Sequence, residues 1–397
     1  MSTDRFLLIK AWSSVLCADI DHVLSQLLIA EMTDRIPVVF WPTHCLHNGF
    51  IQTNGFELYF ESISNDSIFN LVKPEYTYYP PIWDPDNLLV EDQTKDTWTF
   101  RNIGVLLASN ANVVVGDVYY NIYELIPFIK KSHPAYGMTV EDAYRYIFNK
   151  YIRIKPDIDV EIQGFYNSWI RDCHPALAVH VRRVDESLIF TTREADKFEN
   201  QYWNKFYIKY KRKHRKKKDE KVKSYRLLKK GRYKEPNKAY HKEIKQLVDK
   251  YNVKKIFLLT DCEETLKEYK AKYGSMLVYT DCKRLSAEDE VSLLENPMIK
   301  RRRGIEVLKD AYVASKCDYF IGNDFSHLSH TIARIKDWPD KCIKLLYWRY
   351  KKRKYPINTK LILKDRNNIF SRLARKVKNF IGKHLNKPLD GGETDAK

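Results

Sequence analysis

The chain has 397 residues, of which 44% are apolar and 13% aromatic, enough to fill the cores of two domains and too many for a globally disordered protein. No stretch approaches the roughly 20 uncharged apolar residues of a membrane-spanning helix, and residues 1–10 lack the pattern of a signal peptide. The net charge is +18, but segments 201–235 and 349–387 each carry a net +13. The basicity therefore belongs to two appendages, and the rest of the chain is acidic.

Short apolar runs alternate with helical patterns along both halves of the chain. Apolar runs without polar alternation predict strands that are buried on both faces, as in parallel sheets. The predicted strands are Phe6–Ile9, Pro37–Trp41, Ile103–Leu107, Asn112–Val115, Leu177–Val181, Ile256–Leu259, Tyr319–Ile321 and Ile343–Leu346. The predicted helices are Asp21–Met32, Thr139–Tyr151 and Glu306–Ser315. This alternation predicts an α/β architecture with two sheets.

We place a domain boundary just before the strand at Leu177–Val181, which gives an N-terminal domain of residues 1–165 and a C-terminal domain of residues 166–346. Within the second domain, residues 201–237 form a basic insertion that is either a solvated surface excursion or a partner-binding segment. Seven scattered cysteines without a C-x-x-C pair argue against a disulfide framework and a zinc site, and favour a reducing cytoplasm.

Residues 347–397 form a basic tail, in which residues 367–385 are predicted to be an amphipathic helix. Apolar residues recur there at every fourth position, and lysines and arginines fill the intervening positions. Such a helix can lie in the interface of an anionic membrane, where each basic side chain contributes about 1 kcal/mol of attraction. It can also pack on its own domain. The membrane alternative predicts a peripheral protein on the inner face of a membrane.

The segment Ala176-Leu-Ala-Val-His180-Val-Arg182-Arg183-Val-Asp185 is the most informative stretch. Its apolar residues predict a strand, so the polar cluster falls at the carboxyl end of that strand, where open α/β sheets bind ligands. Two adjacent guanidinium groups can neutralise a diphosphate and donate bidentate hydrogen bonds to it, and Asp185 can hold one of them in place. The alternative is a structural Arg–Asp pair at a strand terminus.

This segment resembles the H-x-R-R-x-D motif of the α1,6-fucosyltransferase group, which includes the nodulation fucosyltransferases and is related to the protein O-fucosyltransferases. Two later segments match in the same order: Lys255-Ile-Phe-Leu-Leu-Thr-Asp261, and Asp310-Ala-Tyr-Val-Ala-Ser-Lys-Cys-Asp318 with its continuation to Ser326. The resemblance covers residues 175–335 and implies a GT-B fold, in which two Rossmann-like domains face a cleft.

The resemblance also implies roles for the matching residues. Arg182 and Arg183 would hold the diphosphate of a GDP-sugar, Asp310 would accept hydrogen bonds from guanine, and Ser326 with nearby amides would contact phosphate. The full set of implied donor-binding residues is His180, Arg182, Arg183, Asp185, Asp261, Asp310 and Ser326. The chain departs from the family in having Phe325-Ser326-His327 where the family has Ser-Ser, and Glu186-Ser187 where a lysine is common.

The segment from Asp19 to Gln26 has the layout of the first strand-to-helix loop of GT-B enzymes, which faces the cleft. Asp21 and His22 are therefore candidates for the general base, although Asp21 fits equally well as the N-cap of the next helix. Three D-x-D triplets, which start at Asp19, Asp84 and Asp157, match a metal-binding pattern that arises by chance in a chain with 51 acidic residues. Because the arginine pair can supply the positive charge, we expect neither a metal nor any other cofactor.

These observations predict an inverting glycosyltransferase, with Arg183 stabilising the leaving diphosphate. The resemblance implies GDP-fucose as the donor, with GDP-mannose or another GDP-sugar as the alternative, and a polysaccharide or lipid-linked glycan as the acceptor. A rival from another class is a nucleic-acid-binding protein that uses segment 201–235, where tyrosines interleave with the basic residues. We do not expect nucleic acid as a partner, because the rest of the chain is acidic. A catalytically inactive GT-B scaffold is a third alternative.

Overall fold

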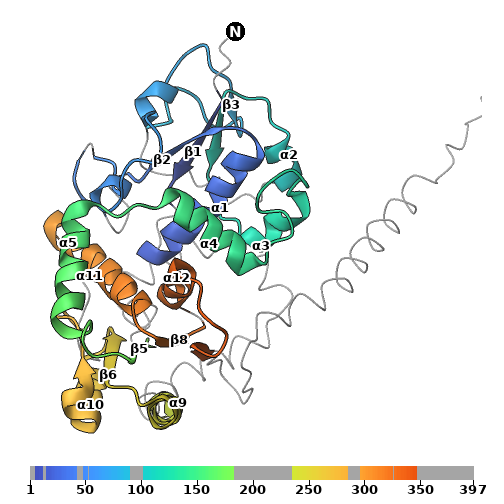
Figure 1. Cartoon of the computed structure of the whole chain (residues 1–397). Helices are drawn as coiled ribbons and strands as arrows, with labels where there is room; N and C mark the ends of the chain where they lie inside the picture. The colour runs from blue at the N-terminus through green and yellow to red at the C-terminus, as the bar shows by residue number, and fades with distance from the viewer. Residues whose placement is uncertain are drawn as a thin grey trace, which may run out of the picture. The chain divides into compact units, whose positions relative to one another are not determined.

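The computed structural model describes residues 5–11, 15–42, 48–51, 53–89, 102–182, 235–284, 296–324 and 326–346 (Figure 1). The chain divides into one unit of residues 1–348 and another of residues 349–397, and every described residue belongs to the first. Arg183, Asp185, most of the basic insertion and the predicted tail helix lie outside the described residues.

The first sheet is parallel, with strand order β2-β1-β4-β3. Its strands are β1 (Phe6–Lys10), β2 (Ile36–Phe40), β3 (Tyr78–Tyr79) and β4 (Val113–Gly116). Alternate residues of β1 face opposite sides, so that Leu7 and Ile9 pack in a core with helix α1 while Phe6 and Leu8 pack against the segment around Trp83. Strands buried on both faces are what the uninterrupted apolar runs predict.

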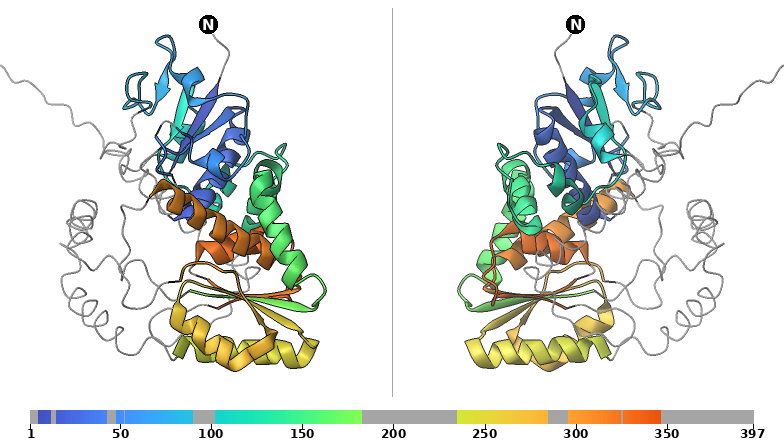
Figure 2. Two further views of the ribbon diagram at one scale, coloured as in Figure 1. Left: turned by 90° about the vertical axis from the view of Figure 1, so that its left-hand side faces the viewer. Right: turned by 90° about the vertical axis from the view of Figure 1, so that its right-hand side faces the viewer.

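The second sheet is also parallel, with strand order β7-β6-β5-β8-β9. Its strands are β5 (Ala176–Val181), β6 (Lys255–Thr260), β7 (Leu277–Val278), β8 (Tyr319–Asn323) and β9 (Ile343–Leu346). Figure 2 shows helices α9 and α10 on one face of this sheet and α5, α11 and α12 on the other. Leu177 and Val179 of β5 pack towards the first pair, and Ala176 and Ala178 pack towards the second group.

The helices connect successive strands, as parallel topology requires. They are α1 (Leu16–Met32), α2 (Ile103–Leu107), α3 (Ile122–Leu125), α4 (Val140–Tyr151), α5 (Pro156–Trp169), α9 (Glu235–Tyr251), α10 (Glu263–Tyr273), α11 (Pro297–Ser315) and α12 (His327–Ile335). Short 3-10 helices are η1 (Phe56–Leu58), η2 (Ile68–Leu71), η4 (Ile126–Phe128) and η5 (Gly274–Met276). Helix α12 packs on α1, α4 and α11, and one continuous apolar core joins the inner faces of both sheets.

Seven of the eight predicted strands are present, and the α/β architecture with two sheets is confirmed. The strand predicted at 103–107 is wrong: these residues form α2, and the Asn102 side chain caps the helix by accepting from the Val105 amide. The interpretation of Asp21 as an N-cap is also wrong, because α1 begins five residues earlier, after Val15. Helix α11 begins at Pro297, nine residues before the predicted start, with Asn296 as its cap.

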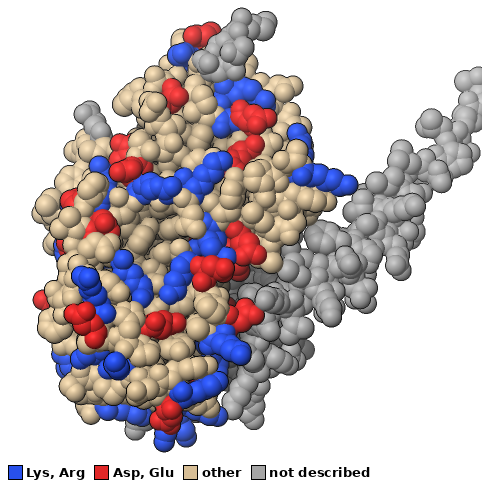
Figure 3. All heavy atoms as spheres, viewed as in Figure 1, with Lys and Arg blue, Asp and Glu red and all other residues tan. Residues whose placement is uncertain are grey.

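The face of the molecule in Figure 3 carries lysine and arginine interspersed with aspartate and glutamate. Several of these charges form pairs between helices, such as Arg301 with Asp157 and Arg302 with Glu161, which join α11 to α5. None of the helices in the described ranges is long and apolar enough to cross a bilayer.

Candidate functional site

The carboxyl edge of the second sheet brings together Arg182 and Asp261, which directly follow β5 and β6. The Thr260 hydroxyl donates to the Val181 carbonyl at 2.9 Å and fixes the two strand ends against each other. The Arg182 Nε lies 3.7 Å from an Asp261 carboxylate oxygen, and the two side chains are 35% and 32% exposed. The Arg182 guanidinium group and the Asp261 carboxylate therefore lie together at this edge of the sheet, and a guanidinium group there suits an anionic ligand.

His180 is the next-to-last residue of β5, two positions before Arg182, and it is buried. Its Nδ1 is 2.7 Å from the Ser329 hydroxyl, which also accepts from the Asn323 amide at 2.8 Å. Burial, with Arg182 nearby, lowers the pKa of His180 to about 3. His180 is thus neutral and fixes the first turn of α12 against β5.

Ser326 is the N-cap residue of α12 and lies three residues after the end of β8. Its hydroxyl makes no capping bond, and its amide donates to the Asn323 carbonyl at 3.0 Å. The amides in the first turn of α12 therefore have no side-chain cap from Ser326, and they lie at the same sheet edge as Arg182. A helix N-terminus favours an anion through these amides and the helix dipole.

Asp310 lies on α11. Its carboxylate contacts Thr280, which comes two residues after the end of β7. Asp310 is 8% exposed, and the Thr280 hydroxyl donates to its carboxylate at 2.6 Å. Burial raises the pKa of Asp310 to about 6, against the opposing effects of Thr280, Arg284 and Lys309. With this pKa, Asp310 is mostly ionised at neutral pH and can accept hydrogen bonds through both carboxylate oxygens.

Asp21 contacts the second half of the chain, although it lies on α1. Its carboxylate forms one ion pair with Arg334 and another with His327, whose Nδ1 is 2.7 Å away; both partners lie on α12. Burial alone would raise the pKa of Asp21, but Arg334 and His327 outweigh it and the pKa is lowered. Arg334 in turn stacks over the Tyr144 ring at 3.6 Å and contacts Glu141.

His22, the other candidate base, faces away from α12. It is buried, its Nε2 donates to the Gly116 carbonyl at 3.3 Å, and its ring stacks on Tyr119. Burial lowers the pKa of His22 despite the nearby carboxylates of Asp19 and Asp117. The structure therefore brings Asp21, and not His22, to the helix that begins at the candidate donor site.

Burial raises the pKa of the Cys17 thiol, in the first turn of α1, to about 12, and Arg182, Asp21 and Arg334 all act electrostatically on it. Arg182 and Asp21 were candidates from the sequence, whereas Arg334 carried no sequence signal. His327, the other partner of Asp21, occupies the position after Ser326 where the chain departs from the family pattern.

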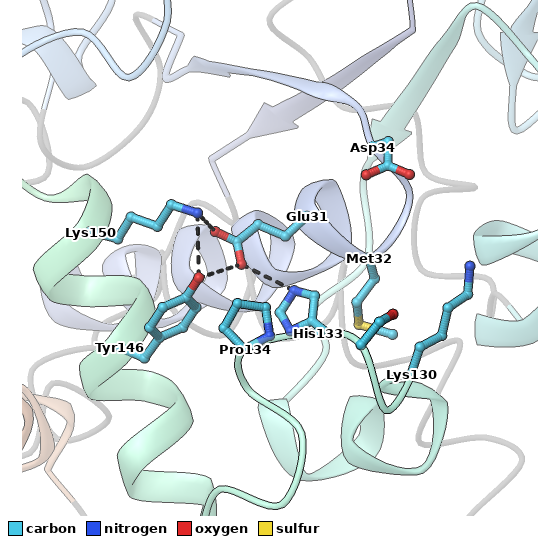
Figure 4. A pocket seen from close by; sticks show the side chains of 9 residues that line it. Glu31, Met32, Asp34, Lys130, His133, Pro134, Tyr146 and Lys150 are labelled. Carbon is cyan, nitrogen blue, oxygen red and sulfur yellow. Dashed lines mark hydrogen bonds and ion pairs between the residues drawn. The ribbon is translucent and has the colours of Figure 1, made fainter.

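A separate pocket of about 400 Å³ lies at the far end of α1 (Figure 4). Its central carboxylate, Glu31, is surrounded by Lys150 at 2.6 Å, His133 at 3.1 Å, Tyr146 at 3.2 Å and Tyr151 at 2.8 Å. With so many partners, Glu31 serves to join α1 to α4. None of the predicted site residues lines this pocket.

Across the part of the chain that the structure describes, no group of three or more histidine, cysteine, aspartate or glutamate side chains is arranged to hold a metal ion. The three D-x-D triplets have other partners there. Asp84 accepts from the amides of Asp86 and Asn87, and Asp157 pairs with Arg301.

No protein-family model matches the sequence, and no curated protein matches it. Solved structures do match. NodZ alpha-1,6-fucosyltransferase soaked with GDP-fucose aligns with 87% of this chain and 95% of its own, at 15% identity and a TM-score of 0.50. The chain shares its fold with NodZ.

A second NodZ structure, from Bradyrhizobium, aligns over 83% of this chain and 92% of its own, at 16% identity and a TM-score of 0.45. POFUT1 in complex with GDP aligns over 88% of this chain and 100% of its own, at 12% identity and a TM-score of 0.46. The resemblance first seen in three short motifs extends to the fold, which NodZ shares over 87% of this chain.

Proposed function

We propose that the protein is a glycosyltransferase that uses a GDP-sugar, with GDP-fucose as the first candidate and GDP-mannose as the second. The observation that carries the proposal is the meeting of Arg182, Asp261 and the N-terminus of α12 at one sheet edge. The fold shared with NodZ, whose structure was obtained with GDP-fucose, supports the choice of donor.

In this proposal the diphosphate binds between Arg182 and the first-turn amides of α12. Arg183, the next residue along the chain, adds the second guanidinium group predicted from the motif. As the bond between C1 and the diphosphate oxygen breaks, these groups stabilise the negative charge that grows on the leaving group. The reaction is proposed to be inverting and to need no metal, because the arginines supply the positive charge.

Asp310 is proposed to recognise guanine. A carboxylate accepts from two neighbouring N–H donors, which guanine offers on one edge and uracil does not. The Thr280 hydroxyl holds the carboxyl group of Asp310 in place at 2.6 Å. This arrangement predicts a preference for GDP-sugars over UDP-sugars.

The test is nucleotide binding and donor turnover by the purified full-length chain. GDP, UDP and CMP binding would be measured by calorimetry, and nucleotide release from a panel of their sugar conjugates would be measured with and without EDTA. We expect GDP to bind and one GDP-sugar to be turned over equally well with EDTA. Turnover of a UDP- or CMP-sugar instead would contradict the guanine assignment.

Matched arginine variants locate the site. Arg182→Ala and Arg183→Ala should each lower turnover about 100-fold or more, because each removes a charge-assisted contact to the diphosphate. Arg302→Ala is the control, since Arg302 forms a partly exposed ion pair with Glu161 between α11 and α5, away from the strand ends. Full turnover in both Arg182→Ala and Arg183→Ala would refute the site.

The acceptor is proposed to be a polysaccharide or a lipid-linked glycan at the cytoplasmic face of a membrane. This part rests on the basic tail of residues 347–397 and its predicted amphipathic helix, which lie outside the described residues. Co-sedimentation of the full-length chain with phosphatidylserine vesicles, and its absence without the tail, is the expected result.

A further inference from the structure

His327 and Asp21 form a histidine–carboxylate pair between helices that belong to different sheets. The His327 Nδ1 lies 2.7 Å from the Asp21 carboxylate. The Asp21 side chain is 4% exposed, whereas that of His327 is 43% exposed. One end of the pair is therefore fixed in the protein interior and the other is open to solvent.

This arrangement determines which nitrogen of His327 can act as a base. Asp21 is held ionised by Arg334, so it accepts a hydrogen bond and the Nδ1 of His327 carries the proton. In the neutral ring the Nε2 is then the basic nitrogen. Among the described residues, Nε2 of His327 has no hydrogen-bond partner. The imidazolium formed when Nε2 takes a proton would be stabilised by the Asp21 carboxylate.

The His327–Asp21 pair lies next to the place where the donor diphosphate is proposed to bind. His327 directly follows Ser326, the N-cap of the helix whose amides are proposed to hold the diphosphate. Asp21 lies on α1, which follows β1 of the first sheet, so the pair joins elements of the two sheets. A base for the acceptor hydroxyl has to lie at such a junction, within reach of the donor sugar and the acceptor together.

We propose that His327 is the general base of the transfer and that Asp21 is its positioning residue. The inference rests on the proposed function. The acceptor oxygen forms a bond to C1 of the donor sugar, and the bond from C1 to the diphosphate breaks with its electron pair on the diphosphate. The proton of the acceptor hydroxyl passes to Nε2 of His327. With water as the acceptor, the products are GDP and the free sugar.

Other charged groups surround the pair, and they bear on its pH dependence. Arg334 and His330 of α12 act on Asp21 from the same helix as His327. Glu141 of α4 pairs with Arg334, and Asp324, after β8, lies near both Glu141 and His330. Only Asp21 bonds His327 directly among the residues described, so a change at His327 removes one basic nitrogen and leaves the Asp21–Arg334 pair intact.

The chain contains a second histidine–carboxylate pair that serves as a control. The His174 Nδ1 lies 2.6 Å from the Asp318 carboxylate, and the His174 side chain is 32% exposed. These residues precede β5 and β8, so the pair lies at the amino edge of the second sheet, opposite the candidate site. The two histidines are similarly exposed, but Asp318 is 40% exposed and the His174 Nε2 lies 3.1 Å from the Tyr166 hydroxyl. His174 therefore controls for the loss of a histidine–carboxylate pair in a place that the proposed reaction does not reach.

The experiment compares His327→Asn with His174→Asn in the full-length chain. Asparagine keeps a polar group near the position of Nδ1 but has no basic nitrogen. GDP release from GDP-fucose, with water as the acceptor, would be measured from pH 5 to 9, and the Kd for GDP would be measured by calorimetry. For His327→Asn we expect kcat to fall about 100-fold or more, while the Kd for GDP stays within about threefold.

Two further readouts separate a catalytic role from a structural one. The pH profile of turnover should differ between wild type and His327→Asn, in which the acidic limb of the wild-type profile should be missing. Added imidazole should restore part of the turnover of His327→Ala. His174→Asn should keep the wild-type rate and profile. In Asp21→Asn, turnover should fall while the Kd for GDP stays within about threefold, because the His327 ring loses the carboxylate that positions it.

A kcat for His327→Asn within about threefold of wild type, with the acidic limb retained, would overturn the assignment of His327. A wild-type protein that binds no GDP and releases none from GDP-fucose would overturn the proposed function itself, and the assignment of His327 with it. The calorimetric measurement distinguishes these two results.

Discussion

Replacing Arg334 with methionine would leave a buried carboxylate without its main counter-charge. The side chains of Arg334 and Asp21 are only 7% and 4% exposed, so water screens their attraction weakly. Two unit charges about 4 Å apart at an effective dielectric constant of about 20 attract by about 4 kcal/mol. Methionine keeps the packing of the aliphatic stem but also loses the stacking of Arg334 on Tyr144. We expect Arg334→Met to lower the free energy of unfolding by about 3–5 kcal/mol.

The assay is urea-induced unfolding at neutral pH, applied to Arg334→Met, Asp21→Asn and the double variant. If the two side chains stabilise the fold through each other, the double variant should lose less than the sum of the single losses, by about 1–3 kcal/mol. The pKa of Asp21 is lowered in the folded state. Its contribution to the free energy of unfolding is therefore present above about pH 4 and is lost as the pH falls further. Strictly additive losses, or a loss below about 1 kcal/mol in Arg334→Met, would refute the reasoning.

Two other predictions concern packing and pH. A Cβ at Gly304 of α11 would overlap the ring of the buried Tyr59, whereas a Cβ at Gly164 of α5 meets nothing within 4 Å. In thermal or urea unfolding, Gly304→Ala should therefore cost about 1–3 kcal/mol and Gly164→Ala should gain about 0.5–1 kcal/mol; effects of the same sign would contradict this. The pKa of His180 is lowered to about 3, so its contribution to stability is complete at high pH and falls below about pH 6.5, by about 2 kcal/mol at pH 5. His180→Asn should show a shallower loss of stability between pH 6.5 and 5 than wild type, and equal slopes would rule out this origin.

The sequence predicted seven of the nine strands in the described residues, because each of these seven is an apolar run bounded by polar residues. It did not predict the two-residue strands β3 and β7, which are too short to give such a run. It failed at residues 103–107, where a run of five apolar residues fits a short helix as well as a strand. Asn102 was the signal for a helix, since its side chain caps α2. The start of α1 was also missed, because residues 16–30 are buried on all sides and show no amphipathic pattern before Asp21.

The candidate site was predictable in part for a similar reason. Arg182 and Asp261 each follow an apolar strand, so their place at the sheet edge follows from parallel topology. The pairing of Asp21 with Arg334 could not be predicted in this way, because the two residues are 313 positions apart and no sequence motif links them. The roles inferred for Arg183 and Asp185 stay predictions from the sequence.

The continuous core between the two sheets limits how they can move apart. Leu7 and Ile9 of β1 belong to the same buried cluster as Ala178 of β5 and Phe320 of β8. Rotating one sheet away from the other would expose this cluster to water at a cost of about 25 cal/mol for each Å² of apolar surface. A rearrangement of local segments at the sheet edges leaves the cluster covered, so we expect the donor of the proposed transferase to exchange by this route.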